Sequence, residues 1–170
     1  FPRQSGGAAP ADILFGDTNP SGRLPVTFPR SVGQIPMNFP VHPGGQARDP
    51  GMVTGPLFPF GFGLSYTKFT YANLKISPTR AGANSPIEIT CDVTNTGQRA
   101  GDEVVQLYLR DDYSSVTTWE KELRGFARVT LAPGEMKPVH FTLTPEHLAL
   151  YDREGKWTVE PGGFTVMIGA

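Results

Sequence analysis

The chain has 170 residues, with 15 Lys and Arg against 16 Asp and Glu, so its formal net charge is −1. A charge balance of this kind does not attract nucleic acid or an anionic membrane surface, and neither is expected as a partner. The single cysteine, Cys91, excludes a disulfide within the chain, and three scattered histidines do not supply a structural metal site. No apolar run approaches the ~20 residues of a membrane-spanning helix, and residues 1–7 have no signal-peptide pattern.

Residues 1–66, called the strip below, are rich in residues that interrupt regular structure. They contain 11 Gly and 11 Pro but only 7 charged residues. The pattern predicts one short helix, from about Gly7 to Phe15, which Gly16 ends. Proline then interrupts every apolar piece, so the strip has no periodic apolar face with which to form its own core. We therefore expect the strip to lie mainly on domains outside this chain, with one small junction to the rest of it.

Residues 67–170 have the composition of an ordinary globular domain and alternate as antiparallel strands do. Turn sequences such as Asn95-Thr96-Gly97 and Pro133-Gly134-Glu135 separate the alternating runs. About seven strands at this spacing predict an immunoglobulin-like β-sandwich. The residues expected to face its core are Ile87, Ile89, Cys91, Val93, Val105, Leu107, Leu109, Val139, Phe141, Leu143, Phe164, Val166 and Ile168.

Two carboxylate pairs are candidates for acid–base chemistry. Asp111 and Asp112 are adjacent, so on a strand they point in opposite directions and are expected to be solvated at a turn. Glu120 and Glu122 share a strand face with Arg124, which is typical of an exposed charged surface. Acid–base hydrolysis needs two carboxylates that face one pocket, and neither pair meets that requirement.

The remaining reactive or aromatic side chains also favour structural roles. Cys91 is expected on an apolar strand face as a buried, inert thiol, and His140 on a polar face in contact with solvent. Trp119 and Trp157 are compatible with a sugar-stacking platform, although packing at the core or the edge of a sandwich is the commoner use of tryptophan. No catalytic residue, metal site or cofactor is expected in the chain.

Several long motifs resemble glycoside hydrolase family 3, most closely the bacterial periplasmic β-glucosidases. In the strip these are ADILFGDTNPSGRLPVTFPR and LFPFGFGLSY, at residues 11–30 and 57–66. In the second part they are VTNTGQRAGDEVVQLYL, KELRGFARVTLAPGE and EPGGFTVMIGA. The resemblance implies a fibronectin type III-like sandwich over 67–170, the end of an α/β sandwich domain over 1–30, and a wrapping linker over 31–66.

Members of this family are retaining, exo-acting β-glycosidases that remove terminal β-linked glucose, xylose or related sugars. For this chain the resemblance implies an enzyme that hydrolyses terminal non-reducing β-D-glucosyl residues in carbohydrate catabolism. The nucleophilic aspartate of family members lies on a TIM barrel in a motif close to SDW, and their acid/base glutamate lies further upstream than residue 1 of this chain. No SDW motif occurs here. The resemblance therefore implies a C-terminal structural part that lacks both catalytic carboxylates, whose partners are upstream TIM-barrel and α/β sandwich domains. It also implies a β-glucoside or oligosaccharide substrate for the whole enzyme, and a periplasmic or secreted location.

Three points stay open from the sequence. In the variable loop 41–55, His42, Arg48 and Asp49 are weak candidates for contact with substrate. Arg23 is expected to pair with Asp12 or Asp17, or with an acidic group of a missing domain. An autonomous carbohydrate-binding or adhesion module of the fibronectin type III type remains the alternative function.

Overall fold

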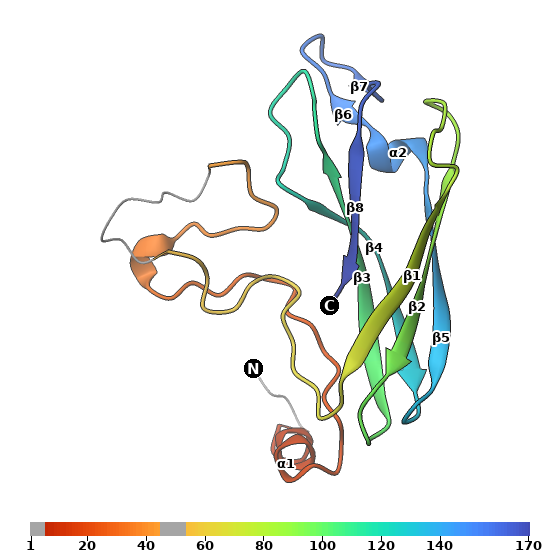
Figure 1. Ribbon diagram of the computed structural model, residues 1–170. Helices are drawn as coiled ribbons and strands as arrows, with labels where there is room; N and C mark the ends of the chain where they lie inside the picture. Colours follow the sequence, from red (N-terminus) through yellow and green to blue (C-terminus); the bar gives the residue numbers. More distant parts are fainter. Residues whose placement is uncertain (1–5, 45–53) are drawn as a thin grey trace.

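Figure 1 shows the computed structural model of the chain, which describes residues 6–44 and 54–170. Two three-stranded antiparallel sheets pack face to face, with strand orders β1-β2-β5 and β4-β3-β8, and the short pair β6-β7 and helix α2 lie at one end. The sandwich elements are β1 (Phe69–Ser77), β2 (Ile87–Asn95), β3 (Gly101–Asp111), β4 (Glu122–Leu131), β5 (Met136–Leu143), α2 (Pro145–Leu148), β6 (Leu150–Tyr151), β7 (Trp157–Thr158) and β8 (Phe164–Gly169). The expected β-sandwich is confirmed.

The core lies between the two sheets and follows the predicted alternation. In β2, Ile89 and Val93 have no exposed surface, and in β3, Val105 and Leu107 are at most 1% exposed. Successive strand residues point to opposite faces, so the intervening side chains point outwards. Phe141 packs against the buried residues, whereas Thr142 beside it is exposed.

The buried polar residue Asn95 stabilises the turn between β2 and β3. Its side-chain oxygen accepts a hydrogen bond from the Thr67 hydroxyl (2.6 Å), and its amide donates to the carbonyls of Arg99 (2.8 Å) and Leu131 (3.0 Å). Asn95 has no exposed surface, so these bonds replace the hydration that its amide loses. The sequence Asn95-Thr96-Gly97 therefore forms a turn, and its buried Asn95 side chain also holds three neighbouring segments together by hydrogen bonds.

The strip contains the predicted helix, α1 (Ala8–Phe15), followed by Gly16 in the left-handed conformation with φ 86°. A short 3₁₀ helix, η1 (Val32–Gln34), follows later. Two distant pieces then run antiparallel: Leu24 donates its backbone N–H to Phe62 (2.9 Å), and Phe28 forms a bridge with Phe58. The two family-like motifs of the strip are therefore neighbours in space.

Parts of the strip contact the outer face of the β4-β3-β8 sheet, through Ser21, Gly61 and His42, whereas the segment with η1 projects away from the sandwich (Figure 1). The outer face of the other sheet carries exposed residues such as Glu88 and Thr142. Gln106 shows the consequence: it lies on the predicted outer face of β3, yet it is only 3% exposed because it donates a hydrogen bond to the carbonyl of Gly61 (3.1 Å). The expectation of one small junction was therefore wrong. Contacts continue from Gly16, which accepts a bond from Arg99, to His42, which stacks on Trp119.

Candidate functional site

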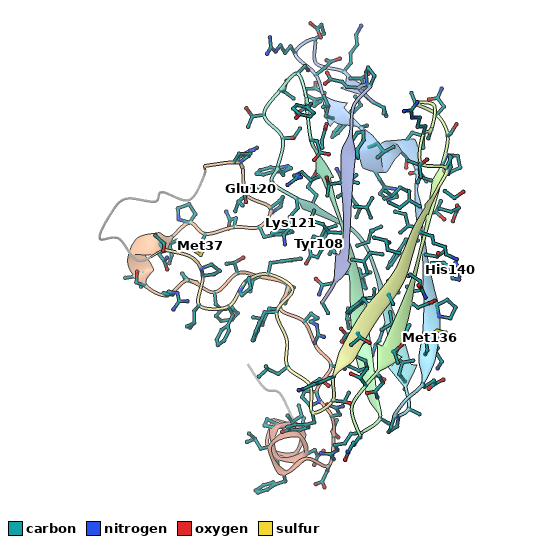
Figure 2. The ribbon with its side chains drawn as sticks, viewed as in Figure 1. Met37, Tyr108, Glu120, Lys121, Met136 and His140 are labelled. Atoms are coloured by element: carbon teal, nitrogen blue, oxygen red, sulfur yellow. The ribbon has the colours of Figure 1, made fainter. Side chains whose placement is uncertain are left out.

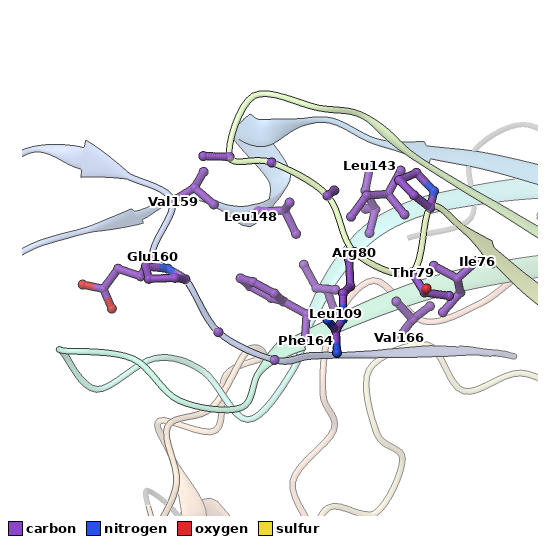
Figure 3. Close-up of a pocket in the computed structure, with 18 residues that line it drawn as sticks. Ile76, Thr79, Arg80, Leu109, Leu143, Leu148, Val159, Glu160, Phe164 and Val166 are labelled. Atoms are coloured by element: carbon purple, nitrogen blue, oxygen red, sulfur yellow. The ribbon is translucent and has the colours of Figure 1, made fainter.

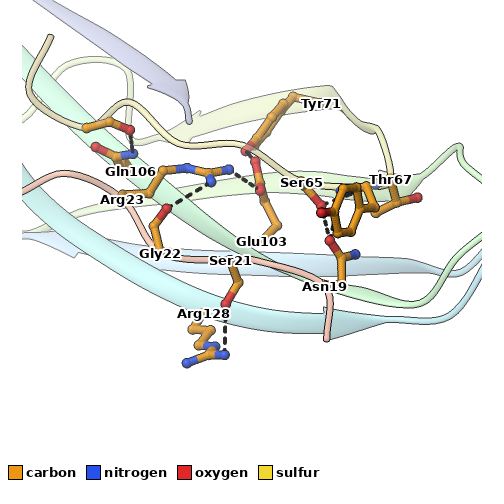
Figure 4. Close-up of polar contacts among 12 residues, drawn as sticks. Asn19, Ser21, Gly22, Arg23, Ser65, Thr67, Tyr71, Glu103, Gln106 and Arg128 are labelled. Carbon is orange, nitrogen blue, oxygen red and sulfur yellow. Dashed lines mark hydrogen bonds and ion pairs between the residues drawn. The ribbon is translucent and has the colours of Figure 1, made fainter. Parts of the chain in front are cut away.

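The centre of the joint between strip and sandwich is an ion pair of Arg23 and Glu103 (Figure 4). Arg23 Nη2 lies 2.5 Å from Glu103 Oε2, and the Tyr71 hydroxyl donates a 2.5 Å hydrogen bond to the other carboxylate oxygen. Glu103 is only 2% exposed. Burial, followed by the hydrogen bond to Glu103, raises the pKa of Tyr71 far above its usual value, so the hydroxyl remains a donor.

The observed partner corrects the expectation for Arg23. The side chain pairs with neither Asp12 nor Asp17 but with a carboxylate of the sandwich 80 residues away. Its Nε atom is buried and has no hydrogen-bond partner within residues 6–44 and 54–170. Sequence reasoning missed Glu103 because it occupies a core-facing position of β3, where a charged side chain is rare unless it is paired.

Neighbouring polar groups of the strip extend the joint (Figure 4). Asn19 donates to the carbonyl of Ala100 (3.0 Å) and accepts from the backbone N–H of Tyr66 (2.8 Å). Ser21 accepts a hydrogen bond of 2.9 Å from Arg128, which also pairs with Asp102. The Asn-Pro-Ser-Gly-Arg stretch is thus attached to the sandwich at three of its five residues.

Two glycines of the FPFGFG stretch make this close approach possible. A Cβ atom on Gly61 would lie 2.5 Å from the Gln106 side-chain oxygen, and one on Gly63 would lie 2.5 Å from an Arg23 guanidinium nitrogen. Gly61 also has φ 82°, a conformation that other residues rarely adopt. Both positions therefore require glycine for packing against side chains of the joint.

A second structured region lies further along the same sheet face, where the strip meets the loop that connects β3 and β4. The backbone N–H of Glu120 donates to the carbonyl of Val41 (2.8 Å). The His42 ring stacks on Trp119, with centroids 3.7 Å apart and an interplanar angle of 17°. The Lys121 ammonium lies 4.8 Å from the centre of the Tyr108 ring, on the side of the sandwich opposite to His140 (Figure 2).

A cleft of about 730 Å³ opens beside this contact, and we call it the loop cleft. Its walls are Pro43 of the strip, Met167 of β8, and residues 110–114 and 116–121. Of the predicted substrate candidates, His42 lies at its border, stacked on Trp119. Arg48 and Asp49 lie outside the described residues.

A second cleft, of about 640 Å³, lies between the edges of β1 and β8 (Figure 3). Its walls are mainly apolar and include the core residues Leu109 and Leu143. Among the described residues, Glu160 is the only carboxylate that lines it. Its side chain points away from the other labelled residues and accepts hydrogen bonds from Ser115. A single carboxylate cannot supply a nucleophile and an acid/base together.

The carboxylate pairs singled out from the sequence are engaged in structural contacts. Asp112 accepts hydrogen bonds from Arg110 (2.9 Å) and the Thr165 hydroxyl (2.9 Å). Asp111 is half-buried rather than solvated, and burial, with smaller contributions from nearby carboxylates, raises its pKa. Glu122 pairs with Arg124 at 2.7 Å, whereas Glu120 is exposed.

The other singled-out side chains match their structural interpretations except for Trp157. Cys91 is 3% exposed, its thiol donates to the Ala72 carbonyl (3.3 Å), and burial raises its pKa. His140 is exposed. Trp157, expected to pack, is 73% exposed and makes an edge contact with Tyr151.

Two further findings concern the whole described region. No three His, Cys, Asp or Glu side chains of residues 6–44 and 54–170 lie close enough together to hold a metal ion. In the same part of the chain, no helix combines the length and apolar character that crossing a bilayer requires.

Comparison with known proteins identifies both parts of the chain. Residues 1–66 match the family model of the glycosyl hydrolase family 3 C-terminal domain, and residues 103–170 match that of the fibronectin type III-like domain. Arg23 belongs to the first match and Glu103 is the first residue of the second, so the ion pair joins the two matched regions.

The chain is similar over nearly its whole length to much longer proteins. It is 47% identical to a β-xylosidase of Formosa agariphila, over 96% of this chain and 23% of that relative. It is 42% identical to a periplasmic β-glucosidase of Salmonella typhimurium, over 99% of this chain and 24% of that relative. A solved β-glucosidase structure from Erythrobacter marinus superimposes with a TM-score of 0.91 at 47% identity, over 96% of this chain and 22% of that one. The chain thus spans about a quarter of the length of the relatives it matches, and it belongs to glycoside hydrolase family 3 as the C-terminal region of such a protein.

Proposed function

We propose that this chain is the structural C-terminal part of a retaining, exo-acting β-glycosidase that removes terminal β-D-glucosyl residues. In this proposal the chain buttresses upstream TIM-barrel and α/β sandwich domains that carry both catalytic carboxylates. Residues 1–30 complete the α/β sandwich domain, 31–66 form the linker, and 67–170 form the fibronectin type III-like domain. Relatives named as β-glucosidases and a periplasmic β-glucosidase support this activity and a periplasmic or secreted location.

The main support for the buttressing role is that the strip exposes many large apolar side chains. In a stable protein, such a group of side chains is normally covered by other parts of the molecule. Of the seventeen large apolar side chains that are exposed among the described residues, eleven lie between residues 13 and 66. Helix α1 has no buried residue, and its Leu14 and Phe15 are 77% and 84% exposed. Exposed apolar surface of this extent marks a protein interface. Upstream domains of the same polypeptide fit this surface, because the strip matches the family model of the glycosyl hydrolase family 3 C-terminal domain and the relatives of the chain are about four times as long.

The activity is tested by comparing the full-length protein with the isolated 170-residue chain on an aryl β-glucoside and an aryl β-xyloside. We expect the full-length protein to hydrolyse at least the glucoside with retention of anomeric configuration, as seen by proton NMR, and the isolated chain to be inactive. Turnover by the isolated chain that survives repurification and is lost in Asp111→Asn or Glu120→Gln would overturn the proposal. A full-length protein inactive on both substrates would also overturn it.

The autonomous-module alternative makes a different prediction for the same two samples. A free-standing binder has no need for an apolar strip surface and would behave identically with or without the upstream domains. Size-exclusion chromatography separates the cases, because an uncovered strip should make the isolated chain self-associate as its concentration rises.

A further inference from the structure

We propose that the loop cleft is a saccharide-binding subsite, built around Trp119, which receives β-linked sugar units other than the one being cleaved. This inference rests on the proposed function, because it assigns the ligand of a surface that the remaining domains of the enzyme would share.

The first support is a rigid aromatic wall. His42 covers one face of Trp119 at a centroid distance of 3.7 Å, and the His42 Nδ1 atom lies 3.2 Å from the carbonyl oxygen of Thr118. The backbone bond between Glu120 and Val41 holds the two segments together. A tryptophan fixed in this way presents a large amphipathic surface at little entropic cost when a ligand binds. Pyranose rings offer apolar C–H faces that suit such a surface.

The second support is the set of polar groups around the tryptophan. Within the described part of the chain, the side chains of Thr117, Glu120 and Lys121 and the Trp119 indole N–H form no hydrogen bond, and the Lys121 ammonium lies over the Tyr108 ring. These groups provide donors and acceptors for ligand hydroxyls without breaking existing bonds. Their availability distinguishes them from Asp112, whose oxygens already accept bonds from Arg110 and Thr165.

The third support is the balance of charge and size. The lining holds two cationic and three anionic side chains, which does not select a strongly charged ligand: Arg110 and Lys121 against Asp111, Asp112 and Glu120. A volume of about 730 Å³ lies within the usual ~300–1,000 Å³ of small-molecule sites. A neutral ligand with many hydroxyl groups and apolar ring faces is the class that fits this lining.

The position of the cleft connects it with the proposed enzyme. Glu120, Lys121 and Tyr108 lie on the side of the sandwich occupied by the strip, whereas His140 and Met136 lie on the other side (Figure 2). Because the exposed apolar strip is the surface that upstream domains would cover, the cleft opens on the side of the molecule that these domains occupy. A longer oligosaccharide held by the catalytic domains is therefore the ligand with access to it.

The test uses the full-length protein and isothermal titration with two probes: glucose, and a sulfur-linked β-1,4-glucotriose that the enzyme cannot hydrolyse. Trp119→Ala should weaken trisaccharide binding about 3- to 10-fold, the loss expected for one aromatic contact, and leave glucose binding unchanged. Trp119→Phe should retain part of the affinity. Lys121→Ala, a change at an exposed side chain, should weaken trisaccharide binding about threefold. This variant provides the test of the subsite if Trp119→Ala does not fold. Trp157→Ala, at the exposed tryptophan on β7, is the matched control and should change neither affinity.

Unchanged trisaccharide affinity in both Trp119→Ala and Lys121→Ala would overturn the subsite. Equal losses for glucose and trisaccharide would overturn it as well, because they would indicate a general structural effect or a protein contact at the cleft. Turnover of the aryl β-glucoside by the wild-type protein is measured in parallel and tests the proposed function alone. A protein without turnover whose trisaccharide binding depends on Trp119 would keep a saccharide-binding site at the loop cleft, but it would lose the glycosidase assignment and the role of that site beside a cleaved sugar unit.

Discussion

In the sandwich, facing sheets bury eleven apolar side chains, from Ile89 to Leu150, whereas α1 in the strip buries none. The strip is instead attached to the sandwich largely through polar contacts such as Arg23 with Glu103 and Asn19 with Ala100. Apolar burial depends on area and tolerates sliding, while hydrogen bonds and ion pairs depend on direction. The sandwich is therefore stabilised by its core, whereas the strip is positioned on it by a polar joint and leaves many of its apolar side chains exposed.

The largest effect is expected where the joint is most deeply buried. Glu103→Ala leaves the Arg23 guanidinium and the Tyr71 hydroxyl without their common partner, and removal of one member of a buried pair costs about 3–5 kcal/mol. Urea denaturation of the isolated chain measures the loss. Lys137→Ala breaks an exposed pair with Glu135, which solvent screens, and should lower stability much less. Equal losses in the two variants would show that the joint is a surface contact.

A cavity in the core of the sandwich should lower the free energy of unfolding almost as much as the loss of Glu103. Leu107 is 1% exposed and belongs to the central cluster, so Leu107→Ala should lower the free energy of unfolding by about 2–5 kcal/mol. Thr142→Ala, on the outer face of β5, should change it by about 0.5 kcal/mol or less. Chemical denaturation of both variants tests the register, and comparable losses would contradict the assigned faces.

A smaller effect is expected from closing the space that Gly63 leaves for Arg23. In Gly63→Ala the new methyl group overlaps the guanidinium and the carbonyl of Gly22, and overpacking of this kind costs about 1–3 kcal/mol. Gly22→Ala is the matched control, because a Cβ there meets nothing within 4 Å. Hydrogen exchange should show faster exchange at the Leu24 amide in Gly63→Ala than in the control. The same exchange rate in both would mean that Gly63 is not needed for docking.

The smallest effect concerns acid stability at the edge of the joint. The hydrogen bond from Thr130 and the nearby Arg128 guanidinium lower the pKa of Asp102. Its contribution to stability is therefore present above the unfolded-state pKa of about 3.9 and is lost as pH falls through the lower folded-state pKa. Between pH 5 and pH 3, Asp102→Asn should lose less stability than the wild type.

The pKa of Asp111 is shifted in the opposite direction, so the pH dependence of its contribution to stability is also opposite. Burial raises its pKa, so the folded state gains stability as pH falls through the folded-state value. Asp111→Asn removes that gain and should lose more stability than the wild type over the same interval. Identical pH profiles for both variants would contradict the two opposite shifts.

The strand faces and the helix could be predicted because they depend on local patterns. The alternation Ile87, Ile89, Cys91, Val93 matched the buried face of β2, and Gly16 ended α1 as predicted. Gln106 was placed correctly on the outer face, but its burial was not foreseen. A strand period of two identifies the face that a side chain occupies, and it carries no information about a distant segment that covers that face.

The sandwich, the short helix and, through long motifs, the glycoside hydrolase family could all be predicted from the sequence, because each depends on residues close together in the chain. Three features required the folded structure: the pairing of Arg23 with Glu103, the close approach of side chains to Gly61 and Gly63, and the stacking of His42 on Trp119. These contacts join residues 40 to 80 positions apart along the chain. Their geometry depends on how two surfaces meet, which composition and periodicity do not specify.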